Sequence, residues 1–425
     1  MIPITIAAFV IFLVLGVPVA FAVGMAGFLG LWWSGAYPLA IIIQQIFLTA
    51  DSFVLLAIPL FVLAGALMET GGIAVRLVRF AQALVGWIRG GLAMAVVVAE
   101  YIFSGISGST IADVSAIGAT MIPPLTKSGY KPEEAVSVVA AASAMGILVP
   151  PCILMIIIGA IANVSVAALF AGGFIPALVL AVAIMGYIYV RARRDKMAAS
   201  QKPSLNELGR ASIDALIPMG LPLIIFGGIL GGVFTPTEAA AVAVLYAAIV
   251  GLFIYREISW SALPGILLHS AVLTANVCFL LGTAAVVAWI LAVAQVPAYL
   301  AELLKALSAG PTVFLVFSAV LYIILGAVIE GPAAVVILLP TFLPVVKLFG
   351  IDVIHYSIVI TAAVGIGLFL PPIGVGLFVS CGIAKVSIDR TLRPMLPYVT
   401  FLCLGLLIVI LFPWFTLILP QILRL

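Results

Sequence analysis

Charged residues are scarce in this chain. Asp, Glu, Lys and Arg make up 8% of its 425 residues, whereas a soluble domain carries about a quarter. Apolar residues make up 66%, and the mean hydropathy is +1.42. This composition indicates an all-α polytopic membrane protein with about ten transmembrane helices. The net charge of +3 is too small to indicate a nucleic-acid partner, and none is expected.

Cysteine and histidine are also rare. The four cysteines have no CxxC spacing, which argues against a disulfide framework or a cysteine-based metal site. His269 and His355 are isolated, and we interpret both as packing or interface residues. No group of acidic or nucleophilic residues resembles a catalytic site. The chain is therefore not expected to be an enzyme or to bind an organic cofactor.

One pattern of residues occurs twice at a constant offset. The matched pairs are Gly105/Gly326, Pro123/Pro344, Gly146/Gly367, Pro150/Pro371 and Pro151/Pro372. A constant offset over this length predicts a duplicated unit. We divide the chain into a first repeat, a cytoplasmic linker, a second repeat and a C-terminal tail, at residues 1–190, 191–212, 213–412 and 413–425.

Each repeat contains two interruptions of apolar sequence. The first repeat predicts a hairpin over 90–125, with its tip at Ser104–Thr110, and a helix over 132–162 that Pro150 and Pro151 break. The hairpin arms are short for crossing a bilayer, so we expect a re-entrant hairpin that enters and leaves on one side. The second repeat predicts a corresponding hairpin over 311–348 and a helix over 354–385, broken at Pro371-Pro372.

The basic residues orient these segments. The linker carries six Lys and Arg residues, which the positive-inside rule places in the cytoplasm. Five crossings in each half then invert the second repeat relative to the first. All basic residues except Lys305, Lys347 and Arg424 face the cytoplasm in this arrangement, which supports it.

Breaks in membrane helices carry a functional meaning. An unsatisfied backbone group in hydrocarbon costs several kcal/mol, so a helix breaks there only where protein or water satisfies the freed groups. A single Pro-Pro pair or Ser/Gly cluster is typical of a kink or of close helix packing. Breaks at corresponding positions of two repeats instead favour a secondary transporter with its site near the midplane, where carbonyl and hydroxyl oxygens bind a cation such as Na⁺.

Three acidic residues lie in apolar surroundings, where such residues are functional candidates. They are Asp51, Asp113 and Glu238. Asp113 and Glu238 are also placed to cap helix N-termini, and we favour that structural role for both. Asn163 and Ser165 follow the first broken helix, where they line a substrate cavity or simply form a turn.

Four stretches resemble the large membrane subunit of tripartite ATP-independent periplasmic (TRAP) transporters, the DctM type. They are SGISGSTIADVSAIGATMIPPL, ILVPPCILMIIIGA, GGVFTPTEAAAVA and LFLPPIGVGLFV. The resemblance extends over the whole chain. It implies an elevator-type, Na⁺-driven importer of a carboxylate, such as a C4-dicarboxylate, a sialic acid or a sugar acid. It also implies the inner membrane of a bacterium or archaeon, a small four-helix subunit of the DctQ type and a soluble periplasmic substrate-binding protein.

The resemblance further implies two Na⁺ sites. The first joins the tip residues Ser107 and Ser109 to Gly146, Val149 and Pro151. The second joins Glu330 and Gly331 to Gly367, Leu370 and Pro372. The second matches the family less well, because Glu330 stands where members often carry Asp and Val328 stands where the first copy has Ser107.

Three alternative functions differ from this one in what they require. A single-component Na⁺/anion symporter would work without a binding protein. An intramembrane enzyme would need paired acids, histidines or a metal set at one depth, which the sequence does not show. A passive channel would not use a Na⁺ gradient for uphill uptake.

Overall fold

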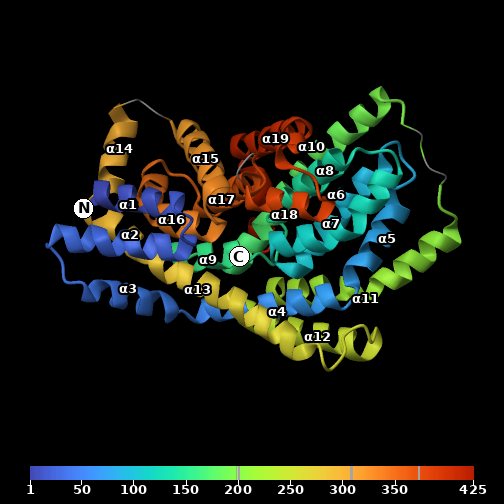
Figure 1. Ribbon diagram of the computed structural model, residues 1–425, viewed down its shortest axis with the longest axis horizontal. Coiled ribbons are helices and arrows are strands. Elements are labelled where there is room, and N and C mark those ends of the chain that lie inside the picture. The colour runs from blue at the N-terminus through green and yellow to red at the C-terminus, as the bar shows by residue number, and fades with distance from the viewer. Residues whose placement is uncertain (198, 200–201, 307–309, 372–373) are drawn as a thin grey trace.

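The computed structural model describes the whole chain except residues 198, 200–201, 307–309 and 372–373. Every regular element in the described ranges is helical (Figure 1). The helices of the first half are α1 (Ile2–Val14), α2 (Val19–Ser34), α3 (Ala40–Ala50), η1 (Phe53–Leu56), α4 (Ala57–Thr70), α5 (Ile73–Val85), α6 (Gly91–Ser107), α7 (Thr110–Lys127), α8 (Pro132–Gly146), α9 (Ile153–Ala162) and α10 (Val166–Arg194).

The same succession of hairpin, broken helix and long helix follows in the second half. Its elements are α11 (Leu205–Leu230), α12 (Pro236–Ile249), η2 (Val250–Ile254), α13 (Leu263–Val293), α14 (Val296–Ala306), α15 (Pro311–Val328), α16 (Gly331–Leu348), α17 (Val353–Leu368), α18 (Val375–Ala384), α19 (Ile388–Leu411) and α20 (Trp414–Ile422). The last of these lies in the 413–425 tail and packs against α10.

Eight helices within the described ranges are long and apolar enough to cross a membrane. They include both arms of the second hairpin, α15 and α16. The first-hairpin arm α6, with 17 residues, falls among the shorter apolar helices. Length and composition therefore do not distinguish a crossing helix from a re-entrant arm, and the ten crossings stay a prediction.

Both hairpins end in tight turns, and the first turn is shorter than expected. Helix α6 continues through Ser107, so only Gly108 and Ser109 separate it from α7. Gly108 adopts a left-handed conformation (φ 65°), which glycine reaches without a Cβ penalty and which ends α6 sharply. In the second hairpin only Ile329 and Glu330 separate α15 from α16.

Both predicted broken helices are interrupted next to their Pro-Pro pairs. Helix α8 ends at Gly146 and α9 begins at Ile153, whereas α17 ends at Leu368 and α18 begins at Val375. Proline lacks an N–H and clashes with the preceding turn, so neither helix continues through the pair. The C-terminal half of each broken helix packs on the hairpin from the other half of the chain, α9 on α16 and α18 on α7 (Figure 1).

The two halves of the chain differ in one long segment. Residues 40–68 are largely apolar, but they do not form one helix, because α3 ends at Ala50 and a 3₁₀ turn precedes α4. Asp51 and Ser52 leave helical geometry at this point. The corresponding helix of the second half, α13, is continuous over 31 residues.

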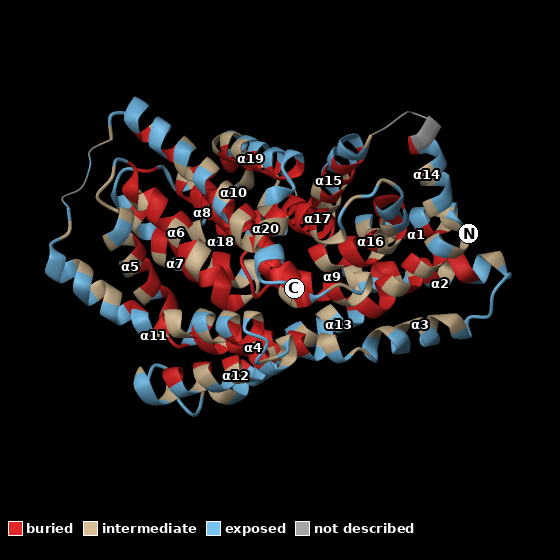
Figure 2. Cartoon of the chain, turned by 180° about the vertical axis from the view of Figure 1, so that it is seen from behind, coloured by how far each residue is buried: buried red, intermediate tan, exposed pale blue. Residues whose placement is uncertain are grey.

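Burial separates a central body from a periphery (Figure 2). Residues 135–146 of α8 and 355–368 of α17 are buried without exception. Helices α1 to α3 and α11 to α13 instead expose large apolar side chains, such as Phe47 at 70% and Leu216 at 69%. In a membrane protein such surfaces face lipid or another subunit. Helices α8 and α17 form the centre of the core, and α6, α7, α9, α15, α16 and α18 pack around them.

Candidate functional site

Asp113 joins the two arms of the first hairpin. Its carboxylate accepts hydrogen bonds from the hydroxyls of Ser104 and Ser107, which lie on the other arm. All three side chains are at most 2% exposed. The prediction that Asp113 caps the N-terminus of α7 is therefore wrong. Its carboxylate oxygens bond to serines of the preceding helix instead.

The hairpin tip lies directly against the break between α8 and α9. A Cβ on Gly108 would lie 3.1 Å from the carbonyl oxygen of Pro151, and a Cβ on Gly146 would overlap the Ser104 hydroxyl. The backbone N–H of Ile153 points to the carbonyl of Gly108 at 3.5 Å. Glycine at 146 therefore permits an approach that a side chain would block, glycine at 108 permits a contact that a side chain would crowd, and the tip lies beside the break.

The carbonyl groups at the two breaks have matching local geometry. The Val149 N–H donates to the carbonyl of Gly146 at 2.8 Å, and the Leu370 N–H donates to that of Gly367 at 2.9 Å. A carbonyl oxygen has two lone pairs, so a single hydrogen bond leaves capacity for a cation. Hard cations prefer oxygen ligands of this kind.

The two tip serines have different surroundings. Ser107 is buried, and its hydroxyl also accepts from the Ser109 backbone N–H at 3.2 Å. Ser109 is partly exposed, and its hydroxyl has no hydrogen-bond partner within the described residues. Ser109 therefore offers an oxygen that is free to bind a ligand, whereas Ser107 already supports Asp113.

Glu100 is a buried acid that our sequence reasoning missed. It is 0% exposed, accepts a hydrogen bond from Ser143 of α8, and has its second oxygen, Oε2, without a partner in the described chain. An acidic residue within the apolar hairpin arm α6 is a functional candidate by its position alone, and this signal could have identified Glu100. With Asp113 it concentrates acidic groups beside the first break.

The predicted second site has a different composition. Glu330 is the exposed N-cap residue of α16, and its side chain makes no capping hydrogen bond. Gly367 lies close to Gly326 of α15. A Cβ added to Gly367 would lie only 3.0 Å from the Cα of Gly326. Gly331 is buried, and its Cβ position is 2.6 Å from a Val364 methyl. Pro372 lies outside the described residues.

The other polar candidates occupy helix ends. Asn163 ends α9 in a left-handed conformation (φ 53°), and the Ser165 hydroxyl caps α10 by accepting from the Ala168 N–H at 3.2 Å. Both are exposed, and contact with substrate stays a prediction. Glu238 forms the expected cap, a capping box with Thr235. Asp51 is the exposed residue that ends α3.

A cavity of about 350 Å³ lies between α3 and α13 on one side and α9 and α16 on the other. Its polar wall consists of Gln45, Thr49 and Ser52, and much of the remaining lining is apolar, from α9, α13 and α16. These three polar residues were not singled out from the sequence. The four-residue spacing of Gln45 and Thr49, which places these two on one face of α3, was the available signal.

These features define a class of protein, a multi-pass helical membrane protein whose core contains paired hairpins and broken helices. Its fold is similar to the solved YdaH transporter of Alcanivorax borkumensis. The TM-score is 0.61 at 18% sequence identity, and the match covers 87% of this chain and 86% of that one.

Sequence comparison identifies the family. Residues 6–415 match the model of the tripartite ATP-independent periplasmic transporter DctM component. The C4-dicarboxylate TRAP transporter large permease of Pseudomonas aeruginosa is 40% identical over 377 residues, which cover 89% of this chain and 88% of that protein. The isethionate TRAP transporter permease DctMQ of Oleidesulfovibrio alaskensis is 35% identical, covering 96% of this chain and 64% of that protein. The chain belongs to the DctM family; it is a TRAP transporter large permease and not an enzyme.

Proposed function

We propose that this permease imports a small carboxylate across the inner membrane, driven by Na⁺. The observation that carries this proposal is the contact between the Ser107–Ser109 tip and the break after Gly146. One free hydroxyl, carbonyls with spare lone pairs and the neighbouring acids Asp113 and Glu100 provide oxygen ligands and negative charge for a small cation. The first Na⁺ site would use Ser107, Ser109, Gly146, Val149 and Pro151.

The second Na⁺ site would use the corresponding turn. Gly367 and Leu370 repeat the geometry of Gly146 and Val149, which supports their role together with Glu330, Gly331 and Pro372. At the constant sequence offset between the two halves, Ala334 is the residue that corresponds to Asp113. The second site therefore lacks the buried carboxylate of the first site. We therefore assign the stronger Na⁺ binding to the first site.

The substrate would occupy the space between the two Na⁺ sites and the peripheral helices. Helices α7, α9, α16 and α18 begin without a side-chain cap hydrogen bond. Apart from the Ile153 N–H, which points to the Gly108 carbonyl, their N-terminal N–H groups would face an anion. The name of the Pseudomonas aeruginosa relative supports a C4-dicarboxylate as the first candidate, with sialic acids and sugar acids next. Asn163 and Ser165 would contact the substrate as it leaves or enters.

Transport would follow an elevator mechanism. The body formed by α6 to α9 and α15 to α18 would move against α1 to α3 and α11 to α14. The 350 Å³ cavity lies at the boundary between these two groups, which is where such a movement would occur. Packing of α9 on α16 and of α18 on α7 supports movement of the body as one unit.

The proposed orientation has the linker in the cytoplasm and the two repeats inverted, as the distribution of basic residues suggests. In a background without native cysteines, Asn206→Cys should react with an impermeant thiol reagent only from the cytoplasmic side. Ala36→Cys, in the exposed turn after α2, should react only from the periplasmic side. Labelling of both positions from the same side would contradict the inverted topology.

The function is tested by uptake in vesicles that contain the permease, its small subunit and its binding protein. An inward Na⁺ gradient should accumulate the labelled substrate above its external concentration, because ion flow supplies the energy. A K⁺ gradient of the same size is the control and should give equilibration at most. Equal accumulation under both gradients would exclude Na⁺ coupling.

A further inference from the structure

Two adjoining cavities lie where α10 meets the polar linker. The smaller has a volume of about 410 Å³ and the larger about 650 Å³; both are lined by Trp87, Ile88 and Lys202. We call the smaller one the basic interfacial pocket and define it by Trp87, Arg89, Tyr189, Arg193 and Lys202, which line it. Three separate segments of the chain thus bring three cations to one cavity.

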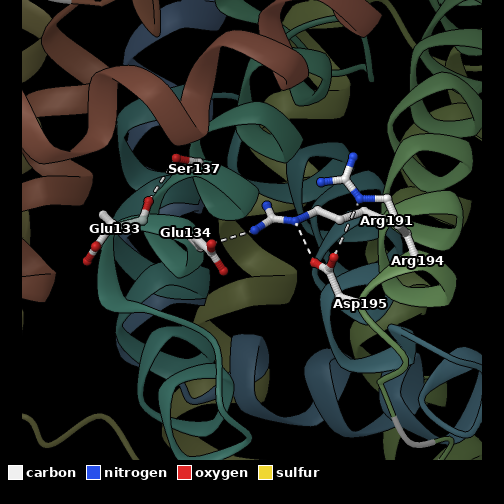
Figure 3. A network of polar contacts seen from close by, with 6 residues as sticks. All are labelled: Glu133, Glu134, Ser137, Arg191, Arg194 and Asp195. Carbon is white, nitrogen blue, oxygen red and sulfur yellow. Dashed lines mark hydrogen bonds and ion pairs between the residues drawn. The ribbon is translucent and has the colours of Figure 1, made fainter.

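These cations have no acidic partner within the described residues. The ion pairs at the end of α10 use the neighbouring arginines instead, because Arg191 binds Glu134 and Asp195, and Arg194 lies 3.8 Å from Asp195 (Figure 3). Glu207 lines the larger cavity, but its carboxylate accepts the Ser204 N–H at 2.8 Å in a capping box. Arg89, Arg193 and Lys202 therefore leave a net positive charge that an anion would neutralise.

The pocket lies at the level where a membrane meets water. Arg193 is in the last turn of the apolar helix Val166–Arg194, and Trp87 and Tyr189 are residues typical of the membrane interface. Next to them Val190 is 65% exposed and Leu84 is 40% exposed. A ligand at this position would meet cations at one end and an apolar surface at the other.

We propose that the basic interfacial pocket binds the phosphate of an anionic phospholipid headgroup, in the leaflet that borders the linker. Arg89 and Arg193 would donate hydrogen bonds to the phosphate oxygens, since guanidinium groups match that geometry. Lys202, whose ammonium lies 4.7 Å from the centre of the Trp87 ring, would add a third charge. The acyl chains would lie along the exposed apolar residues of α5 and α10.

Native mass spectrometry of the purified chain tests this proposal with phosphatidylglycerol as the probe and phosphatidylcholine as the zwitterionic comparison. The wild-type protein should retain phosphatidylglycerol preferentially. Arg193→Gln should weaken that binding about fivefold, which corresponds to about 1 kcal/mol for one basic residue near anionic lipid. The triple variant R89Q/R193Q/K202Q should weaken it about a hundredfold.

Arg194→Gln is the matched control, because Arg194 is the adjacent residue, is 87% exposed and does not line the pocket. It should leave phosphatidylglycerol binding unchanged. Equal binding by the wild-type and Arg193→Gln proteins would overturn the proposal. Displacement of the lipid by glycerol 1-phosphate at comparable concentration would also overturn it, because the pocket would then be a site for soluble phosphates.

Discussion

Vesicles that contain this permease alone are expected to take up almost no substrate, even under an inward Na⁺ gradient. Within the described residues the chain consists mostly of helices, and no segment is large enough to form a separate substrate-capturing domain. The 350 Å³ cavity has no charged lining residue that would select a carboxylate from dilute solution. We infer that affinity and selectivity reside in a soluble partner.

Addition of the small subunit and the cognate binding protein should restore uptake. This chain aligns with 64% of the relative named DctMQ. The remainder of that relative is long enough to contain a fused small subunit, which supports a separate small subunit as the partner of this chain. A binding protein for an unrelated substrate is the control and should not restore uptake. Robust uptake by the permease alone would favour the single-component Na⁺/anion symporter.

The second large effect is expected for Asp113→Asn. The substitution retains the size of the side chain but removes the negative charge that two buried serines support and that lies beside the proposed cation. A hydrogen bond to a charged group contributes about 1.5–3 kcal/mol, so the apparent Na⁺ affinity should fall roughly tenfold to hundredfold. The measurement is the Na⁺ concentration that gives half-maximal uptake.

Asp214→Asn is the matched control for this experiment. Asp214 is an exposed residue of α11, and the same chemical change there should leave the Na⁺ dependence unchanged. An unaltered Na⁺ dependence in the Asp113→Asn protein, at normal expression, would show that Asp113 only holds the two arms of the hairpin together.

The sequence was informative where backbone chemistry dominates. Gly108 and the Pro-Pro pairs interrupt helices through steric effects that act locally, so both hairpins and both breaks could be located to within a few residues. Glu238 was correctly interpreted as a cap, because a capping box needs only residues three positions apart. The family was also identified correctly from motifs around these same positions.

The remaining features depend on contacts between distant segments. Asp113 bonds to serines on the opposite arm, and Glu100 bonds to Ser143 of another helix, so neither role follows from local spacing. Ser104 was placed in the tip, but it lies within α6, since only Gly108 has the geometry that ends the helix. The interruption at Asp51 and Ser52 contains no glycine or proline, so no local steric signal marks the point where α3 ends.

The packing of α9 on α16 and of α18 on α7 bears on the predicted duplication. Through these contacts each half of the chain buries part of the surface of the other. One half alone would leave those faces uncovered and its broken helix without support. If the two halves arose by duplication, as the constant sequence offset predicts, the single-copy ancestor is expected to have paired with a copy of itself.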